Sequence, residues 1–449
     1  MIRRRVLVIG LDGAPASLLL GGTQELFPNL HRLARAGQFG VLRSCDPPIT
    51  VPAWACMLSG RDPGELGLYG FRHRYGHGYA DQELVHSGLL PLGMLWDWVG
   101  ERGGRVILLG VPPAYPPPRL DGVVVSCLLT PGGTRPRCEP SETESLLSTI
   151  APDYRCDIAD FRSTPDAVLL EQAVCALRAR FRVARELARR EPWDLFVLTD
   201  IGSDRVQHGL WGASGDNGHP GAEVHAYYQQ VDAEIGVWTS ELPDDVCIWI
   251  VSDHGAQRCR GGVFLNEWLR RRGWLRLVSD TIGARSLTPK MVDWHRTRAW
   301  AEGGYVGRIY LNVRGRQAHG TVDHADVDRV CEDLRAALCA DLAEREDGRV
   351  PILASRPQEI YRDCRGFPPD LLVYVDGLRW RVFGGVGVHP LWSEQNDFGR
   401  DRANHHHDGV FIAWDPHASS YGFRGVLPLV SLRGLWERQL LGEPAEFLG

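Results

Sequence analysis

The sequence predicts an α/β fold in which a mostly parallel central sheet is flanked by helices. Short apolar runs that end in small or acidic residues recur along the first two thirds of the chain. Helical patterns lie between several of these runs, which is the β-α-β order of a parallel sheet covered on both faces. An apolar fraction of 44% in 449 residues is enough for a large core and excludes disorder as the main state.

Five apolar runs are expected to supply strands of this sheet, at residues 6–10, 106–110, 123–126, 195–199 and 247–252. The clearest helix is predicted to begin near Thr164, with Pro165 in the first helical position, and to end at about Arg190. Apolar residues recur along this helix at helical spacing. The helix leads directly into the run at 195–199, as expected for a β-α-β unit.

The pattern changes after Asp253. Residues 303–313 alternate like a strand, residues 326–345 have helical periodicity, and residues 370–375 are expected to form another strand. A final strand is predicted at 410–414, beyond a stretch rich in glycine, proline and histidine. We therefore expect three parts, namely a core α/β domain at 1–259, an inserted α+β region at 260–390 and a C-terminal return to the core at 391–449.

Net charge and the lengths of the apolar runs exclude two classes of partner. A formal net charge of −6 provides no basic face for a nucleic-acid backbone. The longest apolar runs, at 123–129 and 246–251, are far shorter than the ~18 to 20 residues that span a bilayer. We therefore expect neither nucleic-acid binding nor membrane insertion, and the oligomeric state is left open.

The N-terminal residues imitate a signal peptide without completing one. Three arginines precede the apolar run at 6–11, but Asp12 ends that run below the ~7 to 15 residues of a secretory core segment. The 11 cysteines are odd in number, scattered and without a C-x-x-C pair, which is typical of free thiols in a reducing compartment. A cytoplasmic protein is expected.

Two polar residues stand where α/β proteins bind ligands. Asp12 ends the first apolar run, and the carboxyl end of a parallel strand faces the usual ligand crevice. Thr50 lies two residues before Pro52 at an expected helix start, where backbone N–H groups and the helix dipole favour an incoming phosphate. Each residue also has a simpler interpretation, since Asp12 would cap the following turn and Thr50 would cap its own helix.

Two pairs of potential metal ligands follow in the sequence. Asp204 and His208 are four residues apart, so on a helix both side chains would share one face and could bind one divalent ion. Asp253 and His254 close the buried run at 247–252. The alternatives are an ordinary ion pair on a solvated helix face for the first pair and a hydrogen-bonded core histidine for the second.

Three consecutive histidines, His405, His406 and His407, precede the run at 410–414. They are either a solvated cluster or the source of one or two inner-sphere ligands. Taken together, and with one of these three histidines counted, the candidate residues supply one hydroxyl, three carboxylates and three imidazoles. That set is enough for two three-ligand metal sites that share a bridging nucleophile.

The order of these residues resembles the alkaline phosphatase superfamily, and most closely its type I phosphodiesterase/nucleotide pyrophosphatase branch. The resemblance rests on Asp12, Thr50 with Pro52, Asp204-x-x-x-His208, Asp253-His254 and His405-x-x-Asp408-Gly409. It implies an alkaline phosphatase-like core, with the 260–390 region as a substrate-selecting cap and 391–449 as the source of the last ligand. One divalent ion would be held by Asp12, Thr50, Asp253 and His254, and a second by Asp204, His208 and His405.

The resemblance also gives Thr50 the role of nucleophile. A threonine hydroxyl is too weakly acidic to attack at neutral pH, but coordination to a divalent ion stabilises its alkoxide. Thr50 would attack phosphorus in line and form a covalent intermediate, while the second ion neutralises charge on the leaving oxygen. Zinc is the expected metal because histidine and carboxylate donors are mixed, and manganese and iron are compatible with the same donors.

The expected function is cleavage of a phosphodiester or pyrophosphate bond in a nucleotide-like small molecule. A sulfatase is disfavoured because Thr50-Val51-Pro52-Ala53-Trp54 lacks both the convertible cysteine or serine and the arginine of that branch. Phe71 occupies the position at which nucleotide pyrophosphatases of this branch have an asparagine donor. Arg72 and His73 are candidate replacements for substrate binding, and an arginine would suit a doubly charged monoester as well as a diester.

Three alternatives therefore stay open. The same residues would serve a phosphomonoesterase acting on a nucleotide or sugar phosphate, or a phosphoryl transferase with an alcohol as acceptor. A binding protein that keeps the fold without the reaction is the third alternative. It is disfavoured because every expected metal position holds a competent donor.

Overall fold

The computed structural model of the chain describes residues 1–21, 25–132, 135–213, 219–279, 283, 285–345, 348–388, 390–397 and 399–444. The chain forms two compact units. The first unit comprises Met1–Leu66, Val85–Gln257 and His405–Gly449, and the second comprises Gly67–Leu84 and Arg258–Asn404. The second unit therefore draws on a short stretch of the first third of the chain as well as on the long segment after residue 257.

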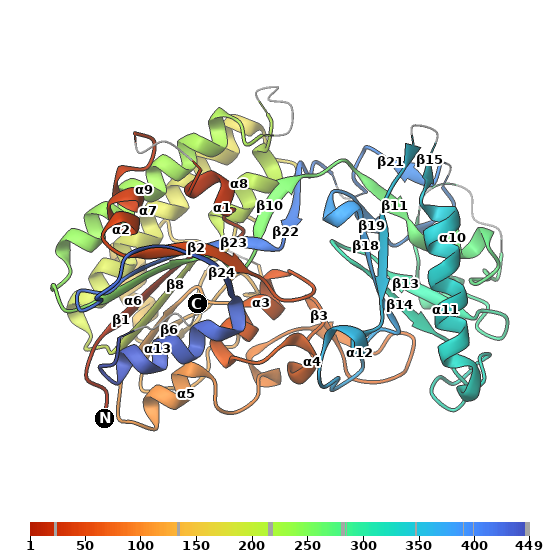
Figure 1. Cartoon of the computed structure of the whole chain (residues 1–449), viewed down its shortest axis with the longest axis horizontal. Coiled ribbons are helices and arrows are strands. Elements are labelled where there is room, and N and C mark those ends of the chain that lie inside the picture. Colours follow the sequence, from red (N-terminus) through yellow and green to blue (C-terminus); the bar gives the residue numbers. More distant parts are fainter. Residues whose placement is uncertain are drawn as a thin grey trace. The chain divides into compact units, whose positions relative to one another are not determined.

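Among the described residues, the first unit is built on a nine-stranded sheet in the order β24-β2-β23-β9-β1-β8-β5-β6-β7 (Figure 1). Strands β9, β1, β8, β5 and β6 run parallel, and they are the five strands predicted from the apolar runs. The predicted α/β class with a mostly parallel sheet is confirmed. The strand bounds are β1 (Val6–Leu11), β2 (Gln38–Arg43), β5 (Val106–Leu109), β6 (Gly122–Val125), β7 (Cys138–Glu139), β8 (Leu195–Asp200), β9 (Cys247–Val251), β23 (Asp408–Trp414) and β24 (Gly422–Pro428).

Helices cover both faces of this sheet because successive strand residues point to opposite sides. In β1, Leu7 and Ile9 belong to one apolar core, and Val6 and Val8 to the other. The first core is covered by α1 (Ala16–Leu19), α2 (Pro28–Arg35), α6 (Thr143–Ile150), α7 (Asp166–Arg190), α8 (Gly202–Leu210) and α9 (Ala222–Glu241). The second is covered by α3 (Thr50–Ser59), α5 (Leu95–Gly100) and α13 (Leu432–Leu440) (Figure 1).

Helix α7 matches the predicted helix except at its first residue. Pro165 is extended, with ψ of 147°, and is the N-cap, so the first helical residue is Asp166. The prediction of Pro165 in the first helical position is wrong by one residue. The Thr164 hydroxyl donates a hydrogen bond to the carbonyl of Asp160 at 2.8 Å.

The second unit contains an antiparallel sheet in the order β13-β14-β18-β17, whose apolar core includes side chains of α10 and α11. Smaller pairings complete the unit, namely β19-β11-β21, β12-β20, β15-β16 and β3-β4. The bounds are β3 (Arg72–Arg74), β4 (Gln82–Leu84), β11 (Gly262–Phe264), α10 (Leu265–Arg271), β12 (Arg285–Ser286), β13 (Ala299–Glu302), β14 (Gly307–Leu311), α11 (Val327–Ala337), β15 (Glu344–Arg345), β16 (Gly348–Arg349), β17 (Ile352–Ser355), α12 (Pro357–Ile360), β18 (Leu371–Val375), β19 (Arg381–Phe383), β20 (Gly385–Val386) and β21 (Trp392–Ser393).

The strand predicted at 303–313 is confirmed in part, as the shorter β14 (Gly307–Leu311). It forms a hairpin with β13, in which Ala301 pairs with Ile309. Gly303 and Gly304 lie in the turn, and Gly304 has φ of 138°, in the range that favours glycine. The helical periodicity at 326–345 corresponds to α11, which continues as one π-helical turn at Leu338–Leu342.

The run predicted as the final strand is β23, but it is not the last one. Strand β24 follows and pairs in parallel with β2 at the edge of the sheet. It has exposed Phe423 and Val426 and ends at Pro428, so it lacks the apolar signature of the inner strands. No helix among the described residues combines the length and apolar character needed to cross a membrane.

Candidate functional site

The carboxyl ends of β1 and β9 bring three of the predicted ligands together. Asp12 directly follows β1, and Asp253 and His254 follow β9, its parallel neighbour. All three side chains are fully buried. Each offers one donor atom, and these donor atoms lie within 4.8 Å of one another. We call this group the Asp12 cluster.

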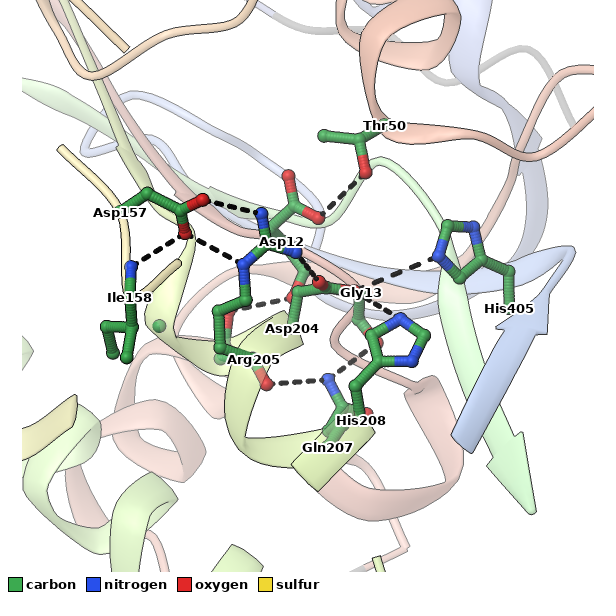
Figure 2. A network of polar contacts seen from close by, with 12 residues as sticks. Asp12, Gly13, Thr50, Asp157, Ile158, Asp204, Arg205, Gln207, His208 and His405 are labelled. Atoms are coloured by element: carbon green, nitrogen blue, oxygen red, sulfur yellow. Dashed lines mark hydrogen bonds and ion pairs between the residues drawn. The ribbon is translucent and has the colours of Figure 1, made fainter. Parts of the chain in front are cut away.

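A second group of three donors forms around α8. One helical turn separates Asp204 from His208, and Asp204 Oδ1 lies 3.1 Å from His208 Nε2. His405 comes from β22 (Ala403–His406), and its Nε2 lies 3.9 Å from the same oxygen (Figure 2). The three donor atoms lie within 4.8 Å of one another and are buried. We call this group the Asp204 cluster.

The two clusters are adjacent. The rings of His254 and His405, one from each cluster, are stacked with centroids 3.7 Å apart. The Nδ1 atom of each ring lies within hydrogen-bond distance of a backbone carbonyl. His254 Nδ1 lies 2.9 Å from the Gly255 oxygen, and His405 Nδ1 lies 2.6 Å from the Pro48 oxygen. A carbonyl oxygen only accepts hydrogen bonds, so Nδ1 carries the proton and Nε2 keeps the lone pair that can bind a metal.

Thr50 is the first residue of α3 and lies beside the Asp12 cluster. Its hydroxyl oxygen lies 3.4 Å from Asp12 Oδ1 and 3.3 Å from His254 Nε2. The N-cap position belongs to Ile49, and the Thr50 side chain makes no capping hydrogen bond. The simpler interpretation of Thr50 as an N-cap is therefore wrong, and its hydroxyl points into the site.

Local packing fixes the Asp12 carboxylate. Trp54, one turn into α3, donates its indole N–H to Asp12 Oδ2 at 2.8 Å. The Trp54 ring lies against Gly10 of β1, where an added Cβ would come within 2.1 Å of a ring carbon. A glycine at this position allows α3 to approach the strand, and this approach places Thr50 next to Asp12.

Burial and neighbouring charges act differently on the three carboxylates. Burial raises the pKa of Asp12 well above its usual range, and the nearby carboxylates of Asp253 and Asp204 raise it further. Burial also raises the pKa of Asp253, although the Gly13 N–H opposes this shift. For Asp204 burial acts in the same direction, but His208 and Arg205 outweigh it and lower its pKa.

These side chains fit divalent cations. Three buried carboxylates this close together need a compensating positive charge. Asp253 Oδ2 is buried and accepts no hydrogen bond within the described part of the chain. Burial lowers the pKa of His254 and of His405, which favours the neutral imidazoles that metals bind.

The neighbouring histidines point elsewhere. His407 Nε2 lies 2.6 Å from Asp46 Oδ1, and His406 Nδ1 accepts a hydrogen bond from the backbone N–H of Asp408. Of the three consecutive histidines, the structure brings His405 to the other candidate ligands. Arg72 and His73 lie on β3 of the second unit, and their role in substrate binding stays a prediction.

Sequence reasoning missed two residues that hold Asp204. Arg205 donates to Asp204 Oδ2 at 2.7 Å and binds both oxygens of Asp157, at 2.8 and 3.0 Å. Asp157 lies in an irregular segment 48 residues before Arg205 in the chain. The only local signal was an arginine directly after a candidate ligand, which is common on solvated helices.

Comparisons with known proteins agree with this fold. The profile of the family described as type I phosphodiesterase/nucleotide pyrophosphatase matches residues 6–401. Human ectonucleotide pyrophosphatase/phosphodiesterase 5 superposes with a TM-score of 0.60 at 12% identity, covering 99% of this chain and 97% of that one. The murine protein, as an inactive threonine-to-alanine variant in complex with AMP, gives 0.60 at 12% identity and coverages of 100% and 97%. No curated protein matches the chain by sequence.

At this identity the solved structures show the fold alone, whereas the profile match shows the family. That family is metal-dependent, and the Asp12 and Asp204 clusters are two candidate metal-binding groups. The chain therefore belongs to the type I phosphodiesterase/nucleotide pyrophosphatase family of the alkaline phosphatase superfamily and is a hydrolase that acts on phosphoric ester bonds.

Proposed function

We propose that the chain is a two-metal phosphodiesterase or nucleotide pyrophosphatase that cleaves a nucleotide-like small molecule through a covalent intermediate on Thr50. One observation carries the proposal. The Thr50 hydroxyl lies 3.4 Å from Asp12 Oδ1 and 3.3 Å from His254 Nε2, beside two adjacent groups of three buried donors. A hydroxyl in hydrogen-bond contact with a carboxylate and an imidazole is the arrangement that an activated nucleophile requires.

The two clusters would each hold one divalent ion. Asp12, Asp253 and His254 would bind the first ion and Asp204, His208 and His405 the second. Bound there, the ions supply Lewis acidity that lowers the pKa of the Thr50 hydroxyl and neutralises charge on the phosphoryl and leaving oxygens. Three protein donors with mixed nitrogen and oxygen atoms, and a fourth position open to substrate, favour zinc.

Thr50 performs the first displacement. Its hydroxyl gives its proton to solvent as the oxygen attacks phosphorus and the P–O bond forms. The bond to the leaving oxygen breaks on the opposite side, and that oxygen departs as an anion that solvent protonates. The first turn of α3 favours the transferred group, because the positive end of the helix dipole attracts phosphoryl oxygens. Water then cleaves the Thr50 ester in a second displacement, so two inversions give net retention of configuration at phosphorus.

A phosphomonoesterase is the second candidate, and Phe71 is the observation that favours it. Phe71 stands where the resemblance places an amide donor for a diester, and a phenyl ring donates no hydrogen bond. Arg72 and His73, next in sequence, would supply donors suited to a dianion. The two candidates differ only in the group attached to the transferred phosphate.

Hydrolysis of a nitrophenyl nucleotide diester and of a nitrophenyl monoester tests both candidates. We expect the zinc-loaded chain to prefer the diester. Thr50→Ala should lower kcat by at least about 10⁴-fold, the size of effect seen when a nucleophile is removed. Thr149→Ala is the matched control, because Thr149 is exposed on α6 and its hydroxyl donates to the Ser145 carbonyl of the same helix.

Acid quenching followed by mass spectrometry should locate the trapped ester on Thr50. Hydrolysis by Thr50→Ala at the rate of the unmodified chain would overturn the nucleophile. A large preference for the monoester would overturn the diesterase and leave the second candidate.

A further inference from the structure

The two carboxylate oxygens of Asp204 have separate partners. Oδ1 faces the Asp204 cluster, 3.1 Å from His208 Nε2 and 3.9 Å from His405 Nε2. Oδ2 accepts a hydrogen bond from Arg205 Nη1 at 2.7 Å (Figure 2). A charge-assisted bond of this length commits Oδ2 to the guanidinium.

Arg205 is itself held in place. Its Nε and Nη2 donate to Asp157 Oδ1 and Oδ2 at 2.8 and 3.0 Å, which is a two-point fork, and Asp157 Oδ1 also accepts the Ile158 N–H. The guanidinium carbon lies 5.0 Å from the centroid of the Phe161 ring. Side-chain exposure is 10% for Arg205 and 12% for Asp157, so solvent screens this pair little.

We propose that Arg205, aligned by Asp157, is a positioning residue that keeps Asp204 a one-oxygen ligand and thereby selects zinc over manganese at the Asp204 cluster. The proposal rests on the proposed function, since it takes the cluster as a metal site. With Oδ2 engaged, the cluster offers one oxygen and two imidazole nitrogens, which suits a four-coordinate ion with one open position. Manganese and magnesium prefer six ligands rich in oxygen and would gain from a second carboxylate oxygen.

In the Asp12 cluster the corresponding oxygens are engaged by neutral donors among the described residues. Asp12 Oδ2 accepts from the Trp54 indole, and Asp253 Oδ1 accepts from the Gly13 N–H. Because a neutral donor holds an oxygen about half as strongly as a guanidinium does, the selectivity conferred by a charged partner is confined to the Asp204 cluster. A merely structural Arg205 would join α8 to the Asp157 segment and would affect all metals alike.

The test compares zinc and manganese affinities of the full chain by competition with a chromophoric chelator. Asp253→Asn removes a ligand of the Asp12 cluster, so that the measured metal affinity should be that of the Asp204 cluster alone. In that background Arg205→Met should lower the ratio of zinc to manganese affinity by about 10-fold or more, within the 10- to 100-fold range of outer-shell substitutions. Arg205→Lys keeps the positive charge but not the two-point fork, so its ratio of zinc to manganese affinity should lie between those of the unmodified Arg205 and of Arg205→Met.

Asp157→Asn should shift the ratio in the same direction by less, because Arg205 loses its alignment but stays in place. Arg182→Met is the matched control, since Arg182 forms an exposed ion pair, 3.0 Å long, with Asp153, and neither residue is a candidate ligand. The ratio of zinc to manganese affinity should not change in this variant. If Arg205→Met does not fold, Arg205→Lys and Asp157→Asn still decide the question.

The outcomes separate this inference from the proposed function. If the unmodified chain binds no ion, the proposed function and the inference both fail. If it binds one ion, the two-metal function fails, and the zinc-to-manganese ratio in the Asp253→Asn background still decides the inference. If the unmodified chain binds two zinc ions but the Arg205 and Asp157 variants keep the same zinc-to-manganese ratio, the inference alone is wrong, whatever happens to their stability.

Discussion

In the Asp204 cluster the carboxylate accepts a hydrogen bond from Arg205 at 2.7 Å and faces His208 at 3.1 Å. In the Asp12 cluster, within the described part of the chain, Asp12 and Asp253 accept hydrogen bonds from neutral donors. The pKa of Asp204 is accordingly lowered, whereas burial raises the pKa of Asp12 and Asp253. The Asp204 cluster is thus prearranged by the protein, and the Asp12 cluster needs a bound cation to neutralise it.

The largest expected effect is on hydrolysis, where the two clusters should behave alike. Asp253→Asn and Asp204→Asn should each lower kcat/KM by at least about 10³-fold, because each removes a ligand of an ion that stabilises transition-state charge by several kcal/mol. Steady-state assays in excess zinc measure this, with the exposed Asp153→Asn as control. Full activity in either ligand variant would break the two-metal account.

In the presence of a chelator, substitutions in the two clusters should change the free energy of unfolding in different directions. Asp204→Asn removes the anion that faces His208 and accepts from Arg205, while Arg205 keeps its fork to Asp157, and should lower the free energy of unfolding by about 1.5 to 3 kcal/mol. Asp253→Asn removes a buried like charge and should leave this free energy unchanged or raise it. Urea denaturation measures both values. Equal destabilisation by the two variants would remove the distinction drawn between the clusters.

In the presence of a chelator, the titration of Asp12 and Asp253 should determine how the free energy of unfolding depends on pH. The folded pKa of Asp12 and Asp253 lies above the ordinary value of 3.8. Their contribution to stability is therefore fully present below that value and is lost as the pH rises through the folded pKa. Thermal unfolding should show this loss, and Asp253→Asn should reduce it.

Zinc should reverse this loss of stability, since a ligand at a free concentration of 100 times its Kd adds about 2.7 kcal/mol to the free energy of unfolding. A melting temperature in chelator that rises over the same pH range in the unmodified chain, but not in Asp204→Asn, would assign the dominant titration to Asp204 instead.

The smallest effects are expected outside both clusters. His407→Ala removes the contact with Asp46, four residues before Thr50, and should cost about 1 kcal/mol of stability and less than about 10-fold in kcat. His406→Ala should change neither, because the His406 side chain is 40% exposed. His405→Ala should lose zinc. Metal analysis and assays of the three variants therefore check which histidine is the ligand.

Much of the site could be predicted because its residues occupy positions that sequence patterns reveal. Asp12 and Asp253 directly follow apolar runs, and parallel strands align their carboxyl ends. The spacing of Asp204 and His208 places both side chains on one helix face. His405 could be distinguished from its neighbours only by resemblance, since the direction of each side chain depends on how β22 is placed.

The remainder depends on contacts between distant segments. The link from Asp157 to Arg205 joins residues 48 apart and leaves no periodic signal. The edge strand β24 has exposed apolar side chains and ends in proline, so it does not resemble a buried strand. The assignment of Gly67–Leu84 to the second unit likewise follows from tertiary contacts and not from composition.

The central claim is that both clusters bind an ion and together act on Thr50. Anomalous diffraction at the zinc edge, from crystals of active, zinc-loaded chain, tests it most directly. We predict two peaks, one about 2.0 to 2.2 Å from donor atoms of Asp12, Asp253 and His254 and the other at the same distances from Asp204, His208 and His405. A single peak, or none, in protein that hydrolyses the diester would contradict the account.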